Sequence, residues 1–310
     1  MKQAVIDIGS NSMRLTVYEI KENQFKALFK EKKMTGLAGY VENGHLSKEG
    51  IQYACIGLQY FKDILDALEV EQISVFATAS LRNIDNTEEA VQEIKKVTKF
   101  NAEVLSGEEE ASLGYIGASL SNAVNAGAYI DIGGASTEVV IFENKNELKA
   151  LSFPLGSLSL YHSCVKKILP GEGSAKRIKK TIQKEMKDAC SLPDDHQKLL
   201  LCTGGTSRAV LKLVKKLYDL PDDCSKVTAE QFKELCRILK KSDSEAIDLI
   251  LKLTPDRIHT IVPGTIILEY LFDHFNADEL VVSDYGVREG YLWQKVMKNA
   301  PSMSIHKIES

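Results

Sequence analysis

The sequence contains one Trp, seven Pro and six Cys in 310 residues, and it has no long hydrophobic run. The six cysteines lie far apart, with no C-x-x-C pair and no histidines at ligand spacing. This argues against a zinc site or a disulfide framework and favours buried free thiols. No apolar run approaches the roughly 18 residues needed to cross a bilayer. The first residues enter a strand pattern directly, without the regions of a secretory signal. We therefore expect a soluble, cytoplasmic protein.

Arginine is also scarce, with seven residues among 39 basic ones. The formal net charge of −4 argues against a general nucleic-acid coat but not against a focused anion site. A guanidinium binds phosphate bidentately, although any one arginine could instead pair with a structural carboxylate. Five arginines lie in or beside Gly/Ser/Thr-rich turns: Arg14, Arg82, Arg208, Arg257 and Arg288.

An internal repeat is the most informative feature that the sequence does have. Residues Ala4–Glu19 and Ala128–Glu143, offset by 124, are identical at seven of sixteen positions. Two copies at this distance indicate two domains of one design rather than a solenoid. Each copy predicts a strand that brings an aspartate, Asp7 or Asp131, to its carboxyl end. The glycine turn that follows would direct backbone amides inward and suit phosphate, with the carboxylates available for a divalent cation.

Further strand–turn–helix junctions extend this pattern. ATASLRNIDN (77–86) reads equally well as a phosphate-binding junction and as an ordinary helix entry, PLGSLSLY (154–161) could offer helix N-terminal amides to an anion, and CTGGTSRAV (202–210) adds a third Gly-containing junction. The element order predicts an α/β protein with two actin-like (RNase H-like) domains and a cleft between them. We expect domains at 1–122 and 123–290, with residues 291–310 packing back on the first and a hinge near 121–126.

The stretch SGEEEA (106–111) predicts a helix start. Ser106 and Glu109 fit a capping box, which gives Glu109 a structural explanation. Glu110 is not accounted for by that box. The residues alone favour a solvent-exposed Glu110, with a position in the cleft as the alternative.

Eight motifs in order resemble the exopolyphosphatase and guanosine pentaphosphate phosphohydrolase (Ppx/GppA) family of the actin-like ATPase superfamily. They cover nearly the whole chain: DIGSNSMRL (7–15), ATASLRNIDN (77–86), SGEEEASLGY (106–115), DIGGASTE (131–138), FPLGSLSL (153–160), TGGTSRA (203–209), RIHTIVPG (257–264) and VSDYGVREG (282–290). The resemblance implies removal of the terminal phosphoryl group from inorganic polyphosphate or from pppGpp, with Mg²⁺, or Mn²⁺ in its place.

The resemblance also implies roles for particular residues. The family's catalytic glutamate falls on Glu110, which reverses the solvent-exposed interpretation. Metal binding falls on Asp131 and Glu138, with Asp7 assisting through water. Substrate phosphate contacts fall on Asn11, Arg14, Arg82, Gly133, Gly134, Ser136, Gly205 and Arg257.

The chain departs from the family pattern in two respects. Ala135 replaces the third glycine of the DIGGG motif, where a methyl group could narrow the turn. The sequence also resembles the short form, without the C-terminal HD-like extension. Two rival functions are a barely catalytic sensor of (p)ppGpp or polyphosphate and an actin-like ATPase or kinase. Expected partners are the phosphate substrate and, as an option, a second copy of the chain, but no nucleic-acid polymer and no membrane.

Overall fold

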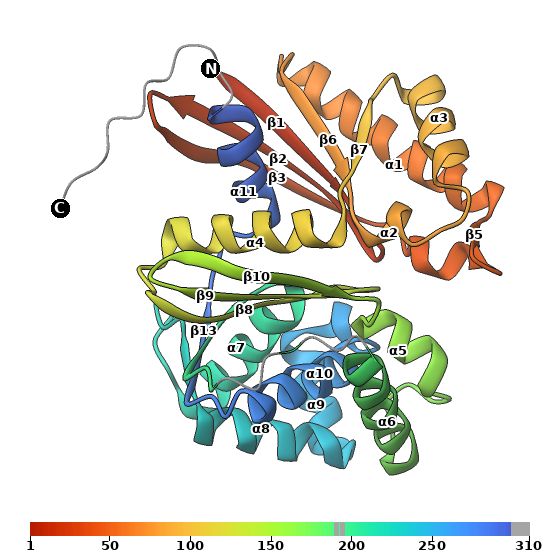
Figure 1. Ribbon diagram of the computed structural model, residues 1–310. Coiled ribbons are helices and arrows are strands. Elements are labelled where there is room, and N and C mark those ends of the chain that lie inside the picture. The colour runs from red at the N-terminus through yellow and green to blue at the C-terminus, as the bar shows by residue number, and fades with distance from the viewer. Residues whose placement is uncertain (189–191, 193–195, 299–310) are drawn as a thin grey trace. The chain divides into compact units, whose positions relative to one another are not determined.

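The computed structural model describes residues 1–188, 192 and 196–298, and these form two compact units (Figure 1). The first unit comprises Met1–Ser106 and Arg288–Ser310, and the second comprises Gly107–Val287. The second unit is therefore continuous in sequence, whereas the first is assembled from both ends of the chain. The expected boundary after residue 122 would instead assign the helix Gly107–Ser121 to the first unit.

The first unit is built on a five-stranded sheet of order β3-β2-β1-β6-β7. The first three strands form antiparallel hairpins, and β6 and β7 continue the sheet in parallel. Helix α1 begins where the Ser47 side chain accepts a hydrogen bond from the Gly50 amide at 3.2 Å, as its sequence predicts. The elements are β1 (Lys2–Ile8), β2 (Ser12–Lys21), β3 (Gln24–Met34), η1 (Leu37–Tyr40), β4 (Val41–Glu42), β5 (His45–Leu46), α1 (Lys48–Ala67), β6 (Ile73–Ala77), α2 (Ala79–Arg82), α3 (Thr87–Thr98) and β7 (Ala102–Val104).

The second unit is built on a six-stranded sheet of order β10-β9-β8-β11-β13-β12. The hairpins β8-β9 and β9-β10 are antiparallel, and β11 and β13 follow in parallel. Its elements are α4 (Gly107–Ser121), β8 (Ala126–Ile132), β9 (Thr137–Glu143), β10 (Asn146–Phe153), α5 (Ser157–Cys164), α6 (Glu172–Asp188), β11 (Leu199–Thr203), α7 (Gly204–Tyr218), β12 (Lys226–Thr228), α8 (Ala229–Lys241), α9 (Ser244–Leu253), η2 (Pro255–Arg257), α10 (Ile261–His274) and β13 (Glu279–Val282).

The two sheets share one plan, because each has two antiparallel hairpins followed by parallel strands on the same side of the first strand. Strand β1 corresponds to β8, and β2 corresponds to β9. The predicted duplication and mixed α/β class are thereby confirmed.

The final described segment, α11 (Val287–Tyr291) and the π-helical η3 (Leu292–Met297), belongs from Arg288 onward to the first unit. Tyr18 of β2 donates a 2.7 Å hydrogen bond to Glu289, whose side chain is buried. Burial, and then the nearby Glu289 carboxylate, raise the pKa of Tyr18. The Tyr291 ring stacks on Phe76 at 4.9 Å, and its hydroxyl donates to Glu103 at 2.7 Å. These contacts attach the end of the chain to the first sheet.

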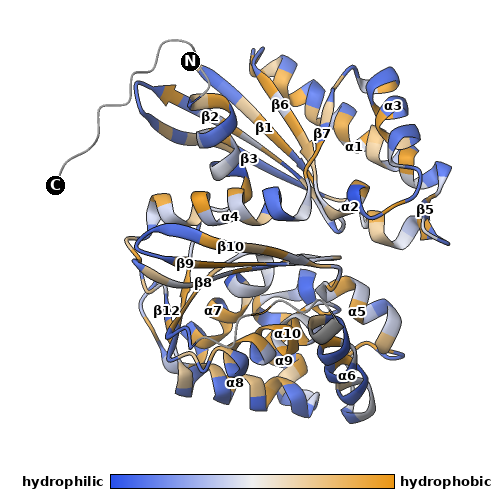
Figure 2. Cartoon of the chain, viewed as in Figure 1, coloured by the Kyte–Doolittle hydropathy of each residue, from blue (hydrophilic) through white to orange (hydrophobic). Residues whose placement is uncertain are grey.

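Helix α4 packs on the second sheet through small and aromatic side chains, among them Ala111, Tyr115 and Ala118 against Tyr129 and Phe142. A separate apolar core fills the other side of that sheet under α7, α8 and α10. Hydropathy colouring shows that apolar and polar residues alternate along several strands and along the covering helices (Figure 2). Since Glu110 directly precedes the packed face of α4, this packing determines where its carboxylate lies.

Five cysteines lie in the described ranges, and all five are free thiols: Cys55, Cys164, Cys202, Cys224 and Cys236. All but Cys224 are buried, as expected. Cys190 lies outside the described residues. No helix in the described part of the chain is long and apolar enough to cross a membrane.

Candidate active site

The turn between β1 and β2 carries the predicted residues of the first unit. The strand register pairs Asp7 with Arg14, so a carboxylate and a guanidinium lie on directly opposite residues. The Asn11 carbonyl accepts hydrogen bonds from the amides of Thr35 at 3.2 Å and Gly36 at 3.0 Å. These bonds fix the turn backbone and leave the Asn11 side chain half-buried at its surface.

Arg82 lies at the end of α2, five residues after the parallel neighbour of β1 ends at Ala77. Its guanidinium donates to the Leu105 carbonyl at 3.2 Å. The hydroxyl of Ser80 donates to the Ile8 carbonyl, which ties the start of α2 to the end of β1. The structure thus places Asp7, Asn11, Arg14 and Arg82 at one edge of the first sheet, where the carboxyl ends of β1 and β6 meet.

The corresponding turn of the second unit, Gly133–Ser136, is closed by a 2.9 Å hydrogen bond from the Gly133 amide to the Ser136 carbonyl. None of these four described residues has a positive φ. Ala135 therefore adopts a backbone conformation that is ordinary for a residue with a side chain. The replacement of the family's third glycine does not strain this turn.

The N-terminus of α5 holds the same turn from behind. The Ser157 amide donates to the Gly133 carbonyl, and the Leu158 and Ser159 amides donate to the Gly134 carbonyl, all at 2.9 Å. A Cβ at Gly156 would collide with the backbone of Gly134, so only glycine fits this close approach. The expectation that this helix start offers its amides to an anion is wrong, because the turn carbonyls occupy them.

Three carboxylates gather beside this turn. Asp131 and Glu138 are opposite each other in the β8–β9 register, and Glu110 approaches from α4. Glu138 is 1% exposed and Glu110 is 8% exposed. Burial, then the charges of Glu110 and Asp131, raise the pKa of Glu138 well above its ordinary value. The interpretation of Glu110 as solvent-exposed is therefore wrong, and the catalytic role implied by the family resemblance stays a prediction.

Ser152 of β10 supports this cluster in two ways. Its hydroxyl donates a 2.8 Å hydrogen bond to Glu138 Oε1, which favours the ionised carboxylate. Its side chain also lies so close to Gly107 that a Cβ at Gly107 would collide with it. Ser152 therefore contacts Gly107, the first residue of α4, and also Glu138, the carboxylate that lies near Glu110.

Tyr129 is a fully buried residue near the three carboxylates. Its hydroxyl lies 2.8 Å from Thr203 Oγ1, which joins β8 to the TGG junction after β11. Complete burial and the negative charge of Asp131 raise the pKa of Tyr129, with smaller contributions from Glu138 and Glu110. Tyr129 is thus a neutral hydroxyl group under three carboxylates.

The TGG junction lies against the same cluster. Gly204 has φ of 81°, and a Cβ there would collide with the Asp131 carboxylate. Gly205 is in contact range of the Arg257 guanidinium, which comes from η2. The second unit thus collects Glu110, Asp131, the Gly133–Ser136 turn, Glu138, Gly205 and Arg257.

These carboxylates fit a hard divalent cation in donor type and charge. Three acidic side chains in close proximity repel one another, and a cation would relieve the repulsion that raises the pKa of Glu138. In the described ranges, no three His, Cys, Asp or Glu side chains lie close enough together to hold a metal ion by themselves. This is compatible with Mg²⁺, which is commonly bound by one or two carboxylates plus water and substrate phosphates.

Sequence reasoning missed Ser152, Tyr129 and the role of Gly156. Ser152 and Tyr129 lie in apolar strand patterns, where a hydroxyl facing the site cannot be distinguished from one facing a neighbouring strand. Gly156 belongs to a quoted motif, but its contact with Gly134 joins segments that are far apart in the sequence.

Solved structures resemble the whole chain. A crystal structure of the Aquifex aeolicus member of the Ppx/GppA family is 27% identical and covers 96% of this chain and 98% of its own, with a TM-score of 0.77. An exopolyphosphatase from Cytophaga hutchinsonii, at 21% identity and a TM-score of 0.82, shares the fold over 96% of this chain and 98% of its own. The fold and site define a two-domain protein of the actin-like ATPase type.

The family follows from the sequence match. The model of the Ppx/GppA phosphatase family matches residues 16–299, and the chain belongs to this family. A Haemophilus influenzae protein, provisionally named exopolyphosphatase, is 28% identical over 94% of this chain and 90% of its own length. The guanosine-5'-triphosphate,3'-diphosphate pyrophosphatase of Aeromonas hydrophila is also 28% identical, but this chain spans only 58% of its length.

Proposed function

We propose that this phosphatase hydrolyses terminal phosphoanhydride bonds of inorganic polyphosphate, releasing orthophosphate, and that it also converts pppGpp to ppGpp. The observation that carries the proposal is the cluster of the buried Glu110 and Glu138 with the half-buried Asp131 beside a glycine turn. Family membership and the relatives named for these two activities support the substrate class.

Glu110 would act as the general base. Its carboxylate is nearly buried, it faces Glu138, and α4 holds it through close packing on the second sheet. A water held by Glu110 would lose its proton to the carboxylate as it attacks the terminal phosphorus. Phosphoryl transfer depends mostly on positioning and charge stabilisation, so Glu110 would be the only proton acceptor required, and the other residues would position the substrate.

Asp131 and Glu138 would hold Mg²⁺, with Asp7 assisting through water, or Mn²⁺ in its place. When bound, the cation neutralises charge on the terminal phosphates. Ser152 would favour the ionised, ligating form of Glu138 through its 2.8 Å hydrogen bond, against the burial that raises the pKa of this carboxyl.

The remaining predicted residues would bind substrate phosphates. In the second unit these are the Gly133–Ser136 turn, Gly205 and Arg257, and in the first they are Asn11, Arg14 and Arg82. Guanidinium groups and turn amides suit phosphate because both present several N–H donors in fixed geometry. Neither group reads a base, so polyphosphate and pppGpp can share this machinery.

Phosphate release by the purified protein tests the proposal. Medium-length and long polyphosphates, pppGpp and ATP should be compared side by side with Mg²⁺, with Mn²⁺ and with a chelator. We expect release from polyphosphate that needs the cation and is lost in Glu110→Ala. Binding of polyphosphate or (p)ppGpp without release would favour the sensor, and phosphorylation of a small acceptor by ATP would favour the kinase.

Several finer expectations belong to this proposal. They are a cytoplasmic location, Mg²⁺ as the preferred cation and association into a homodimer. The functional division of the chain into domains 1–122 and 123–290 also stays a prediction.

A further inference from the structure

A dense run of basic residues follows α5 in the second unit. Between residues 166 and 184 the sequence contains seven basic residues and one acid, Glu172, although the whole chain has a net charge of −4. The basic residues are Lys166, Lys167, Lys176, Arg177, Lys179, Lys180 and Lys184. We refer to residues 166–184 as the basic segment. Such an excess of positive charge attracts polyanions, although two acids, Glu185 and Asp188, follow it directly in the same helix.

Helix α6 arranges part of this segment as a ridge. Ile178 and Ile182 are fully buried in the core of the second unit, so the helix has a fixed inner face. Lys176, Lys180 and Lys184 follow one another at four-residue intervals on the outer face, and all three are exposed. Figure 2 shows the hydrophilic outer surface of α6. We refer to these three residues as the lysine ridge.

Lys-rich helix faces are usually only solvated, but this ridge differs from the charged faces of α3 and α8. On α3 Lys96 pairs with Glu93, and on α8 Arg237 pairs with Glu234. Among the residues that the structure describes, no acid pairs with any lysine of the ridge. The same stripe of four-residue intervals begins at Glu172 and ends at Asp188, so the three lysines between them are the part that could attract an external anion.

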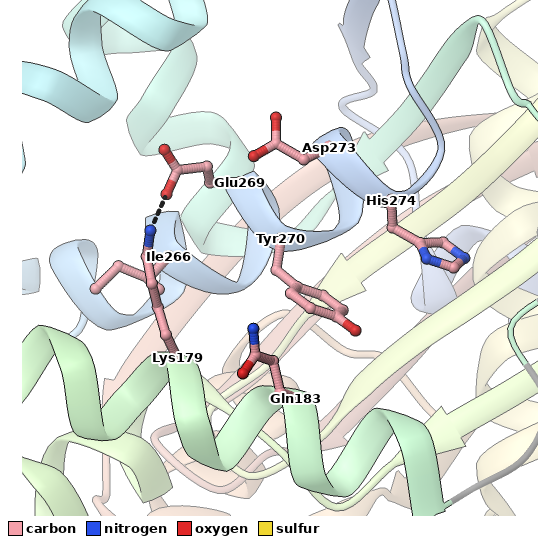
Figure 3. A pocket seen from close by; sticks show the side chains of 7 residues that line it. All are labelled: Lys179, Gln183, Ile266, Glu269, Tyr270, Asp273 and His274. Carbon is pink, nitrogen blue, oxygen red and sulfur yellow. Dashed lines mark ion pairs between the residues drawn. The ribbon is translucent and has the colours of Figure 1, made fainter.

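The pocket next to the ridge has a different character. It has a volume of about 350 Å³ and is lined by Lys179, Gln183, Ile266, Glu269, Tyr270, Asp273 and His274 (Figure 3). Lys179 lies 3.6 Å from Glu269, which also pairs with Lys240. Two acids in the lining disfavour a polyanion there, and Lys179 is already paired. The anion surface is therefore the ridge and not this pocket.

Hydrogen bonds at the two ends of α5 connect the Gly133–Ser136 turn to α6. The N-terminus of α5 is bonded to the carbonyls of Gly133 and Gly134. Eight residues later, the Cys164 carbonyl at the end of α5 accepts hydrogen bonds from Arg177 of α6, the shorter at 2.8 Å. Since an α-helix rises 1.5 Å per residue, α5 spans about 12 Å, and Lys176 to Lys184 spans about as much again.

We propose that the lysine ridge binds the distal phosphates of a long polyphosphate chain whose terminal phosphate lies at the Gly133–Ser136 turn. This inference rests on the proposed function and adds a preference for chain length. A linear polyanion suits the ridge because it carries a negative charge on every unit and can meet ammonium groups about 6 Å apart. Tripolyphosphate and the phosphates of pppGpp are too short to extend past α5.

The test reverses the charge of the ridge in the full chain. The variant Lys176→Glu/Lys180→Glu/Lys184→Glu is compared with Lys26→Glu/Lys30→Glu/Lys95→Glu, which makes the same change of net charge at exposed residues of the first unit. For long polyphosphate we expect KM to rise about tenfold or more in the ridge variant with kcat retained, since each lysine near a polyanion contributes to affinity. The KM for tripolyphosphate and all constants of the control stay as in the unaltered protein.

Salt and folding controls accompany these measurements. The dependence of log KM on log salt concentration should become shallower in the ridge variant only, because fewer counterions are released. If the charge-reversed variant has a lower melting temperature, Lys176→Gln/Lys180→Gln/Lys184→Gln replaces it, with a smaller rise in KM expected.

Several outcomes would overturn the proposal. An unchanged KM for long polyphosphate, an equal rise for tripolyphosphate, or loss of RNA or anionic-vesicle binding with polyphosphate kinetics intact would each do so. If the unaltered protein releases no phosphate, the proposed activity fails, and binding of labelled long polyphosphate in chelator decides about the ridge separately. Weaker polyphosphate binding by the ridge variant, with unchanged binding by the control variant, supports the lysine ridge as the binding surface. Equal binding by the ridge variant and the unaltered protein overturns it.

Discussion

The two copies of the β-hairpin have the same strand pairing, and each contains an aspartate at the same position of the repeat. They differ in the charge of the residue paired with that aspartate. In the first copy Asp7 is opposite Arg14, and in the second Asp131 is opposite Glu138. Positions 14 and 138 are equivalent at the repeat offset of 124. One substitution within a common framework thus separates a balanced pair, suited to phosphate, from an acidic pair, suited to a cation.

The helix beside each hairpin strengthens this difference. Helix α4 adds Glu110 to the acidic pair of the second copy, whereas the first copy has Arg82 at the end of α2. The two similar turns therefore lie in different electrostatic environments, one with arginines and one with acids.

The largest expected effect comes from removing the acid that only the second copy possesses. Glu110→Ala should lower kcat by about 100-fold or more, the usual scale for a positioned base, while substrate still binds. Steady-state phosphate release and equilibrium binding check these two parts. Glu109→Ala is the matched control on the same helix turn. Unchanged turnover in the Glu110 variant would contradict the role of Glu110 as general base.

The equivalent positions 138 and 14 should respond differently to the same new residue. Glu138→Gln is expected to weaken the apparent Mg²⁺ affinity by at least about 10- to 100-fold, because even the loss of a supporting partner costs that much. Arg14→Gln should raise KM for substrate and leave the Mg²⁺ dependence intact. Activity titrated with Mg²⁺ at saturating substrate separates the two. A similar Mg²⁺ response in both variants would show that the copies are electrostatically equivalent after all.

A third, smaller effect is expected at Ser152, which has no counterpart among the predicted residues. Ser152→Ala removes a hydrogen bond to the Glu138 carboxylate and should reduce kcat at limiting Mg²⁺ by about tenfold, since a hydrogen bond to a charged group is worth about 1.5–3 kcal/mol. Ser112→Ala is the control, because Ser112 also links α4 to a glutamate, Glu147, but at an exposed position. Equal losses in both variants would indicate general loosening of α4.

The smallest expected effect is on the pH dependence of stability without a divalent cation. The folded state raises the pKa of Glu138 above its usual 4.5, so it holds a proton that the unfolded chain releases. The free energy of unfolding should therefore fall as the pH rises above about 4.5, and Glu138→Gln should flatten this slope. Denaturant unfolding at several pH values in chelator measures it. A slope of the same size in the variant would mean that other groups cause it.

The sequence was sufficient for the parts of the fold that local patterns specify. The strands around Asp7 and Asp131, the start of α1 at Ser47 and the duplicated order of both sheets agree with the structure. Alternating apolar residues and glycine turns encode these features within short windows.

The sequence was not sufficient where a contact joins distant segments. Glu110 reads as a solvated residue of a helix start, because its burial depends on strands that begin 16 residues later. The start of α5 reads as an anion site, because nothing local shows that the carbonyls of Gly133 and Gly134 occupy its amides. In both cases the local residues allow two interpretations, and only the tertiary contacts of the folded protein distinguish them.

The first unit is made of two segments from opposite ends of the chain, and this affects how the two units fold during synthesis. Residues 107–287 leave the ribosome as an uninterrupted block, while the unit that begins the chain still lacks the helix carrying Glu289 and Tyr291. The later block can thus complete its core before the earlier one, against the usual N-terminal-first sequence. A released chain that ends just before Arg288 would contain all of the second unit, and a first unit whose Tyr18 lacks its buried partner.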